Sequence, residues 1–320
     1  MIRVYHRGGQ ACRTVADTAE AFHLDPDILW IDLISPSVEE EKAVEAALGH
    51  GLPTREEMKA LEASSRAWRE EGVTFVVADL IHNGDAETPA LDPVTFVLTP
   101  GPLVTIRYFD PRPFLMMDEK LERDSGLCAT SVDLFLQLME AVIDRTSDVL
   151  GRSVTAVEAI AEHIFSGRKT AGFERLIGKL GRARIANARL EQSLASLLRV
   201  FVFAGLDDRL EQPGDGRERL TSLRRDAQSL LDHNHAVAAS IDFQLNAALG
   251  LINIEQSSII KIFSVAAVAF LPPTLIASIY GMNFQHMPEL DEVWGYPLAL
   301  IAMVVSAVLP LLWFKKKGWL

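Results

Sequence analysis

The sequence predicts a cytoplasmic α/β domain followed by a long helical stalk and two C-terminal transmembrane helices. Three observations support this fold class. Residues 262–288 and 293–314 contain no Asp, Glu, Lys or Arg. The preceding segment, 214–271, lacks proline and repeats apolar residues at helical spacing. The N-terminal residues instead alternate strand-like and helix-like patterns. We expect the three regions to cover residues 1–130, 131–258 and 259–320.

The N-terminal region is typical of a small sheet with helical cover. Residues 28–34 form an apolar run that indicates a buried strand, and Ser37 stands just before the acidic start of a helix. Residues 73–81 and 93–108 also indicate strands, the second stretch being a hairpin that turns at 100–102.

The middle of the chain predicts helices only. Two helical runs cover about 131–165 and 170–206, and a third helix begins near 218 and continues without a break to about 281. At 1.5 Å per residue this helix would be about 95 Å long. Its apolar seam resembles a coiled coil, so we expect the stalk to pack against copies of itself. Asn234 on the seam would either fix the register between helices or face a hydrated cavity. The seam comprises Leu220, Leu223, Ala227, Leu230, Asn234, Val237, Ile241, Leu245, Ala248 and Ile252.

The two charge-free stretches are long enough to span a bilayer core, which requires about 20 residues. Lys261 precedes the first stretch and three lysines, 315–317, follow the second, whereas the connector carries only the acids Glu289, Asp291 and Glu292. The positive-inside rule therefore predicts both termini in the cytoplasm and the connector outside. No signal peptide is visible, and the two cysteines show no metal-binding spacing, which suits a reducing compartment.

Composition argues against several other functions. A net charge of −12 disfavours binding to nucleic acid. The segment 172–179 resembles a phosphate-binding loop only superficially, because its glycine spacing and last residue differ from that motif. No catalytic triad or Cys/His cluster emerges. We therefore expect neither an enzyme nor a protein that needs a cofactor.

Hydroxyl side chains of the first span fall on one stripe of the helix. At steps of three and four, this stripe also includes small and aliphatic residues, so it predicts the wall of a pore. The alternative is that Ser and Thr bond back to their own helix or join helix pairs. Pro272-Pro273 would free carbonyl oxygens at membrane depth, which suits a water-lined helix or a simple kink. The stripe comprises Ser257, Ile260, Ser264, Ala267, Leu271, Thr274 and Ser278.

Gly281, Met282 and Asn283 follow the first span and predict an outer mouth. Gly281 lets backbone carbonyls approach a ligand, and Asn283 offers a neutral amide oxygen. Neutral oxygens suit a small cation that keeps its water, as Mg²⁺ does, because they can accept hydrogen bonds from that water. The connector acids would raise the local concentration of cations.

The C-terminal sequence contains a series of short motifs at fixed spacing. They are Tyr280-Gly281-Met282-Asn283-Phe284, Met287-Pro288-Glu289-Leu290, Gly295-Tyr296-Pro297 and Phe314-Lys315-Lys316-Lys317, with Leu271-Pro272-Pro273-Thr274 upstream. Together, these motifs carry a resemblance to the CorA family of magnesium channels. Residues 253–256 and 261–263 extend it, and Trp30-Ile31-Asp32-Leu33 resembles a strand of that family's cytoplasmic domain.

The resemblance implies a funnel-shaped homopentamer in a bacterial inner membrane. Asn283 and Gly281 would form the outer selectivity ring and hold hydrated Mg²⁺. Leu271 and Phe263 would form hydrophobic constrictions, and intracellular Mg²⁺ bound by acids between domains would close the channel. Ser257 departs from the Asn that the family often has at the cytoplasmic end of the pore. The expected partners are further copies of the chain, the bilayer and divalent metal ions.

Three functions are compatible with the sequence. The first is a passive, potential-driven Mg²⁺ channel that also passes Co²⁺ and Ni²⁺. The second is a zinc transporter of the same superfamily, coupled to protons; that branch commonly departs from Gly281-Met282-Asn283 and from the connector motif, both of which this chain keeps. The third is a non-conducting membrane sensor of cations, which explains the stalk but not the hydroxyl stripe.

Overall fold

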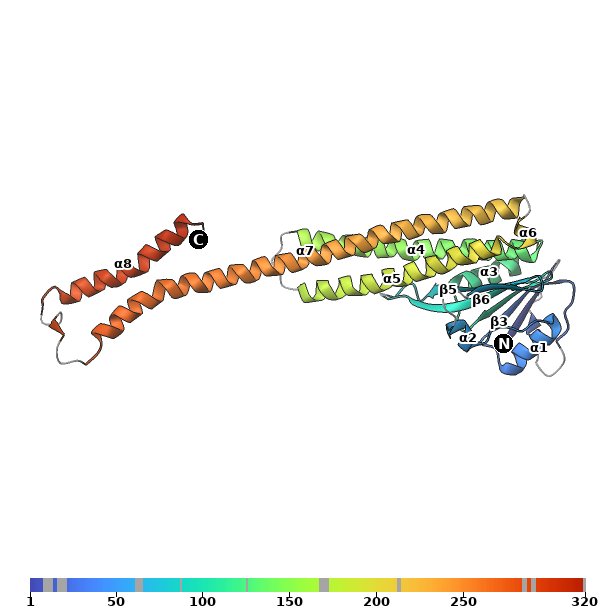
Figure 1. The fold of residues 1–320 in the computed structure, drawn as a ribbon, viewed down its shortest axis with the longest axis horizontal. Coiled ribbons are helices and arrows are strands. Elements are labelled where there is room, and N and C mark those ends of the chain that lie inside the picture. Colours follow the sequence, from blue (N-terminus) through green and yellow to red (C-terminus); the bar gives the residue numbers. More distant parts are fainter. Residues whose placement is uncertain are drawn as a thin grey trace. The chain divides into compact units, whose positions relative to one another are not determined.

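The computed structural model describes residues 1–7, 14–15, 22–60, 66–86, 88–124, 126–166, 173–211, 214–283, 287–288 and 292–318. The chain divides into two compact units, residues 1–245 and 246–320. The first unit holds the sheet and most of the helices (Figure 1).

Seven strands form one sheet within the described part of the chain, in the order β2-β1-β3-β7-β6-β5-β4. All neighbouring strands are antiparallel except β3 and β7, which run parallel. The expected buried strand and the expected hairpin with its turn after Leu98 are confirmed. The strands are β1 (Ile2–His6), β2 (Thr14–Val15), β3 (Ile28–Ile34), β4 (Ala67–Glu70), β5 (Val73–His82), β6 (Ala90–Leu98) and β7 (Leu103–Arg107).

A buried ion pair joins the two parallel strands. The Arg107 guanidinium donates to Asp32 at 2.9 Å, and both side chains are about 1% exposed. Thr105 donates to the same carboxylate at 2.6 Å and accepts a hydrogen bond from the indole of Trp30. Burial alone would lower the pKa of Arg107, but the charge of Asp32 and its hydrogen bonds raise it. Asp32 therefore binds an arginine that stays charged inside the domain.

Helices cover both faces of the sheet. On one face, Val44 of α1 (Val38–Leu48) and Met58 of α2 (Arg55–Ala60) pack on strand residues such as Phe75 and Val97. A capping box starts α1: the Ser37 hydroxyl accepts from the Glu40 amide, and the Glu40 carboxylate accepts from the Ser37 amide.

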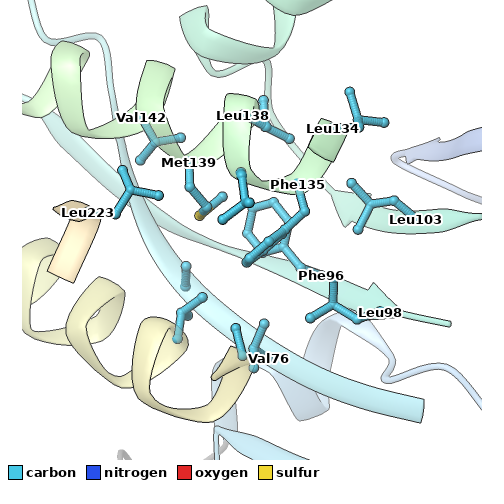
Figure 2. Close-up of a cluster of buried hydrophobic side chains, with 14 of the residues drawn as sticks. Val76, Phe96, Leu98, Leu103, Leu134, Phe135, Leu138, Met139, Val142 and Leu223 are labelled. Atoms are coloured by element: carbon cyan, nitrogen blue, oxygen red, sulfur yellow. The ribbon is translucent and has the colours of Figure 1, made fainter. Parts of the chain in front are cut away.

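The opposite face is covered by α3 (Arg112–Arg123), α4 (Ser131–Phe165) and α5 (Phe173–Ala204). Figure 2 shows Phe96 and Leu103 of the sheet meeting Phe135 and Met139 of α4. Neighbouring strand residues alternate between the two faces, as the period of a strand requires. The first unit is therefore a layered α/β domain, as expected.

The long helix α7 runs without interruption from Asp215 to Tyr280. It follows the short α6 (Asp208–Glu211), and α8 (Gly295–Lys316) is the last helix of the described residues. The expectation of a continuous helix through the first apolar stretch is confirmed. At 1.5 Å per residue α7 is about 100 Å long.

The N-terminal part of the α7 seam has partners within its own chain. Leu220, Leu223 and Ala227 belong to the same buried cluster as residues of α4 and α5. Arg219 of α7 also donates to Asp133 and Glu140 of α4, at 2.6 and 2.9 Å. Helices of the same chain therefore cover this N-terminal part of the seam, and packing of the stalk against copies of itself stays a prediction.

Candidate functional site

The apolar parts of α7 and α8 are uncovered. Each helix contains an 18-residue window that is long and apolar enough to cross a membrane, and only 11% of the residues in each window are buried. The core helix of a soluble protein would be mostly buried. Side chains such as Phe263, Phe270 and Leu309 are instead 72%, 73% and 61% exposed. Both helices therefore present a surface that suits lipid or further protein chains.

Four residues of the expected stripe line one hollow on α7. The hollow has a volume of about 360 Å³. Sequence spacing indicated four of its lining residues but not the other two, Phe270 and Leu275, which flank the stripe at adjacent positions. The lining comprises Ala267, Phe270, Leu271, Thr274, Leu275 and Ser278.

The remaining stripe residues lie further along α7. Ser257 and Ile260 are exposed, Ile260 at 59%, and Ser264 is half-buried. Of the two residues expected to constrict a pore, Leu271 lines the hollow, whereas Phe263 is exposed and is not part of its lining. In a single chain, the apolar surfaces of Leu271 and Phe263 are left uncovered.

The hydroxyl of Thr274 is fixed by its own helix. Its Oγ1 donates to the carbonyl oxygen of Phe270 at 2.7 Å, as Ser306 of α8 does to Met303 at 2.8 Å. Back-bonding was one of the two interpretations of the stripe. It leaves the lone pairs of Thr274 available as acceptors beside the hollow. The water molecules around a cation point their hydrogens outward, so an acceptor oxygen is the group that can receive them.

Two prolines lie inside α7 without ending it. Pro272 and Pro273 lack an amide hydrogen, so the carbonyl oxygens of Val268 and Ala269 cannot form the usual helical bond one turn later. Such oxygens are tolerated at membrane depth where water or neighbouring helices satisfy them. They add two further acceptors to this part of the helix.

The C-terminal end of α7 closes tightly. The amide of Gly281 donates to Ala277 at 2.9 Å, and that of Met282 donates to Ile279 at 3.2 Å. A Cβ at position 281 would lie 3.1 Å from the Ala277 carbonyl oxygen, so a larger residue would displace this turn. Asn283 follows it and is exposed.

The connector after Asn283 is described only in part. Glu292 is exposed and immediately precedes the turn into α8. The other two expected outer-loop acids, Glu289 and Asp291, lie outside the described residues. Within the described ranges, no three His, Cys, Asp or Glu side chains of one chain converge to hold a metal ion.

The long helix α7 starts in the α/β domain and ends in an uncovered apolar segment, and α8 supplies a second such segment. This arrangement defines a two-span integral membrane protein. A family model described as "CorA-like Mg2+ transporter protein" matches residues 25–316. The chain belongs to this family, as the residues around Gly281-Met282-Asn283 indicated.

Curated relatives support the assignment over nearly the whole chain. The magnesium transport protein CorA of Salmonella typhimurium (strain LT2) is 33% identical over 294 residues, which cover 92% of each chain. The protein of the same name from Escherichia coli (strain K12) is 33% identical over 292 residues, covering 91% of this chain and 92% of its own.

Solved structures share the fold. The complete structure of the CorA magnesium transporter from Methanocaldococcus jannaschii covers 100% of this chain and 99% of its own, with a TM-score of 0.78 and 19% identity. The full-length CmaX protein covers 99% of this chain and 97% of its own, with a TM-score of 0.76 and 16% identity. The cytoplasmic domain of ZntB from Vibrio parahaemolyticus is more distant, with a TM-score of 0.55 and 10% identity over 79% of this chain and 98% of its own.

Proposed function

We propose that the chain forms a passive, potential-driven path for Mg²⁺, with Co²⁺ and Ni²⁺ as further ions. The observation that carries this proposal is the row of acceptors along α7, from the hollow beside Thr274 and Ser278 to the exposed amide of Asn283. These groups are neutral, so they suit an ion that keeps its first shell of water.

One chain does not enclose a path, because the hollow lies on the open side of a single helix. We propose that five copies surround a common axis, with α7 of each copy lining it and α8 facing lipid. Leu271 and Phe263 would then form apolar constrictions. Gly281 and Asn283 would form the outer ring, with Met282 between them and Glu292 nearby to concentrate cations.

No energy source beyond the membrane potential is required. A divalent ion that enters an interior-negative compartment gains roughly 4.6 kcal/mol per 100 mV, twice the value for a single charge. We further propose that the membrane is the cytoplasmic membrane of a bacterium, that both termini are inside, and that intracellular Mg²⁺ closes the path by binding acids contributed by neighbouring copies.

The proposal is tested with the purified full chain in liposomes that contain a Mg²⁺-sensitive dye and carry an interior-negative potential. We expect Asn283→Ala to abolish Mg²⁺ uptake, because the outer ring loses its amide oxygens. The matched control is Asn246→Ala, which makes the same change at an exposed position of the same helix, before its apolar part. It should transport like the unaltered chain.

Assembly is measured on the same samples by light scattering, and a mass of five chains is expected for all three proteins. Undiminished uptake by Asn283→Ala would contradict the proposed ring. Uptake of Zn²⁺ that exceeds uptake of Mg²⁺ and disappears without a proton gradient would assign the chain to zinc transport instead. Absence of any flux from correctly assembled protein would favour a sensor.

A further inference from the structure

A second cavity lies in the first unit, far along the sequence from the apolar stretches. It has a volume of about 700 Å³ and lies between α4, α5 and the turn that joins β5 to β6. A volume of this size is typical of sites for small organic ligands. Figure 1 shows α4 and α5 running side by side along this region. The cavity has no role in the proposed transport path.

The rim of the cavity is strongly basic although the protein is acidic overall. Arg152 of α4 and Arg175, Lys179 and Arg182 of α5 line it, and Asp85 is the only carboxylate in the described lining. The net charge of the whole chain is −12. Among the described lining residues, Arg175 and Lys179 therefore run against the acidic composition of the molecule, and they favour an anion as the ligand.

The single carboxylate is already engaged. Asp85 forms ion pairs with Arg145, Arg152 and Arg112 at 3.1, 3.4 and 3.6 Å. The hydrogen bond and charge of Arg145 hold the pKa of Asp85 below its usual value. Asp85 therefore cannot neutralise the cations across the cavity. Within the described residues, the side chains of Arg175 and Lys179 have no ion-pair partner.

The turn is held tightly against α4. A Cβ at Gly84 would lie 2.7 Å from a methyl group of Val149 and 3.2 Å from the Arg145 guanidinium, so only glycine fits there without displacement. The carbonyl oxygen of Gly84 accepts a hydrogen bond from Arg152 at 3.1 Å. These contacts position Arg152 at the edge of the cavity.

The floor of the cavity is apolar. Its apolar lining includes Val149 and Ile160 of α4 and Leu176 and Leu190 of α5. The hydroxyl oxygen of Ser153, also in the lining, is buried and has no hydrogen-bond partner within the described residues. An inorganic anion would satisfy the rim but leave the floor uncovered. An anion with an apolar or aromatic group would satisfy both.

We propose that the cavity between α4 and α5 binds a phosphate ester, with its phosphates on Arg152, Arg175 and Lys179 and its apolar part on the floor. Arginine and lysine are the usual partners of phosphate oxygens. Two sources carry this chemistry: a soluble nucleotide and an anionic phospholipid.

The test uses the full chain in detergent and measures binding of ATP by calorimetry in the presence of a Mg²⁺ chelator. We expect ATP to bind more tightly than inorganic tripolyphosphate, because only ATP covers the floor. The double variant Arg175→Gln/Lys179→Gln should weaken binding by at least about tenfold, since it removes two charged donors. The matched control, Arg224→Gln/Arg225→Gln, makes the same change in net charge at exposed positions of α7.

A parallel arm measures co-sedimentation with phosphatidylcholine vesicles with and without phosphatidylglycerol. If Arg175→Gln/Lys179→Gln weakens the binding of ATP and the control variant does not, the result supports a soluble nucleotide as the ligand. If the same variant alone weakens the binding of phosphatidylglycerol vesicles, the result supports a lipid. Melting curves of both variants establish that they fold. The proposal is wrong if neither ligand binds, if tripolyphosphate binds as well as ATP, or if both double variants behave alike. None of these outcomes depends on Mg²⁺ transport.

Discussion

At the scale of single residues, two buried amides join α5 to α7. The Asn187 side chain donates to the side-chain oxygen of Asn234 at 2.7 Å, and the Asn234 side chain donates to the backbone oxygen of Asn187 at 3.2 Å. Both residues are fully buried. Asn234 therefore bonds to a helix of the same chain, and the fixing of helix register, one of the two roles that the sequence left open, stays a prediction.

Asn234→Ala should destabilise the first unit by about 1–3 kcal/mol, because the buried Asn187 side chain loses one of its two acceptors and the Asn187 backbone oxygen loses a donor. Thermal unfolding of the full chain in detergent, followed by circular dichroism, measures this loss. Asn246→Ala on the exposed side of the same helix is the control and should leave the melting temperature unchanged.

The double variant Asn187→Leu/Asn234→Leu sharpens this comparison. Replacement of both partners by apolar groups removes the unsatisfied donor, so we expect a smaller loss of stability than in Asn234→Ala. Equal melting temperatures for Asn234→Ala and the unaltered chain would show that the amide pair does not hold α7 in place.

At the scale of elements, α7 combines two surfaces on one continuous helix. Its first part buries Leu220, Leu223 and Ala227 in the domain, whereas its last part exposes large apolar side chains and a mostly apolar hollow that includes two hydroxyls. The switch follows from composition, because the charged residues that solvate the first part stop at Lys261. One helix can therefore belong to a soluble domain and cross a bilayer.

Thr274→Val should lower Mg²⁺ uptake in liposomes several-fold while leaving assembly intact. Valine keeps the branched shape but removes the hydroxyl, whose oxygen lies beside the hollow and, in the proposed path, would accept hydrogen bonds from the water around the ion. Ser306→Ala is the matched control: it removes a hydroxyl that bonds to its own helix in the same way, but from α8. Equal effects of the two variants would contradict the assignment of α7 as the lining helix.

At the scale of the whole molecule, the distribution of lysines and acids predicts how the chain crosses the membrane. Glu292 lies in the connector between the two apolar helices, and Arg225 is exposed in the first unit. If both termini are cytoplasmic, the connector faces outward.

This orientation is tested in intact cells with a membrane-impermeant maleimide, in a background that carries Cys12→Ser and Cys128→Ser. Glu292→Cys should react in intact cells, whereas Arg225→Cys should react only after permeabilisation. The reverse pattern would invert the orientation, and reaction at both positions in intact cells would contradict the two-span topology.

Much of this architecture could be read from local sequence. The strand at 28–34, the hairpin at 93–108 and the helix through Pro272 each depend on residues close together in the chain. The stripe on α7 was likewise visible from spacing, although Phe270 and Leu275 were missed. Phe270 precedes the stripe residue Leu271, and Leu275 follows the stripe residue Thr274. Whether a residue next to the stripe reaches the hollow depends on the size of its side chain.

From the sequence alone, one could predict which segments are apolar enough to leave water, that α7 is continuous, and which residues follow its C-terminal end, because these properties depend on composition and on helical or strand period. Three features could not be predicted in this way: β3 pairs with β7, α4 and α5 cover the N-terminal part of the α7 seam, and Arg152 and Lys179 line one cavity. Those contacts join residues far apart in the chain, and their energy depends on three-dimensional packing, which periodicity along the chain does not encode.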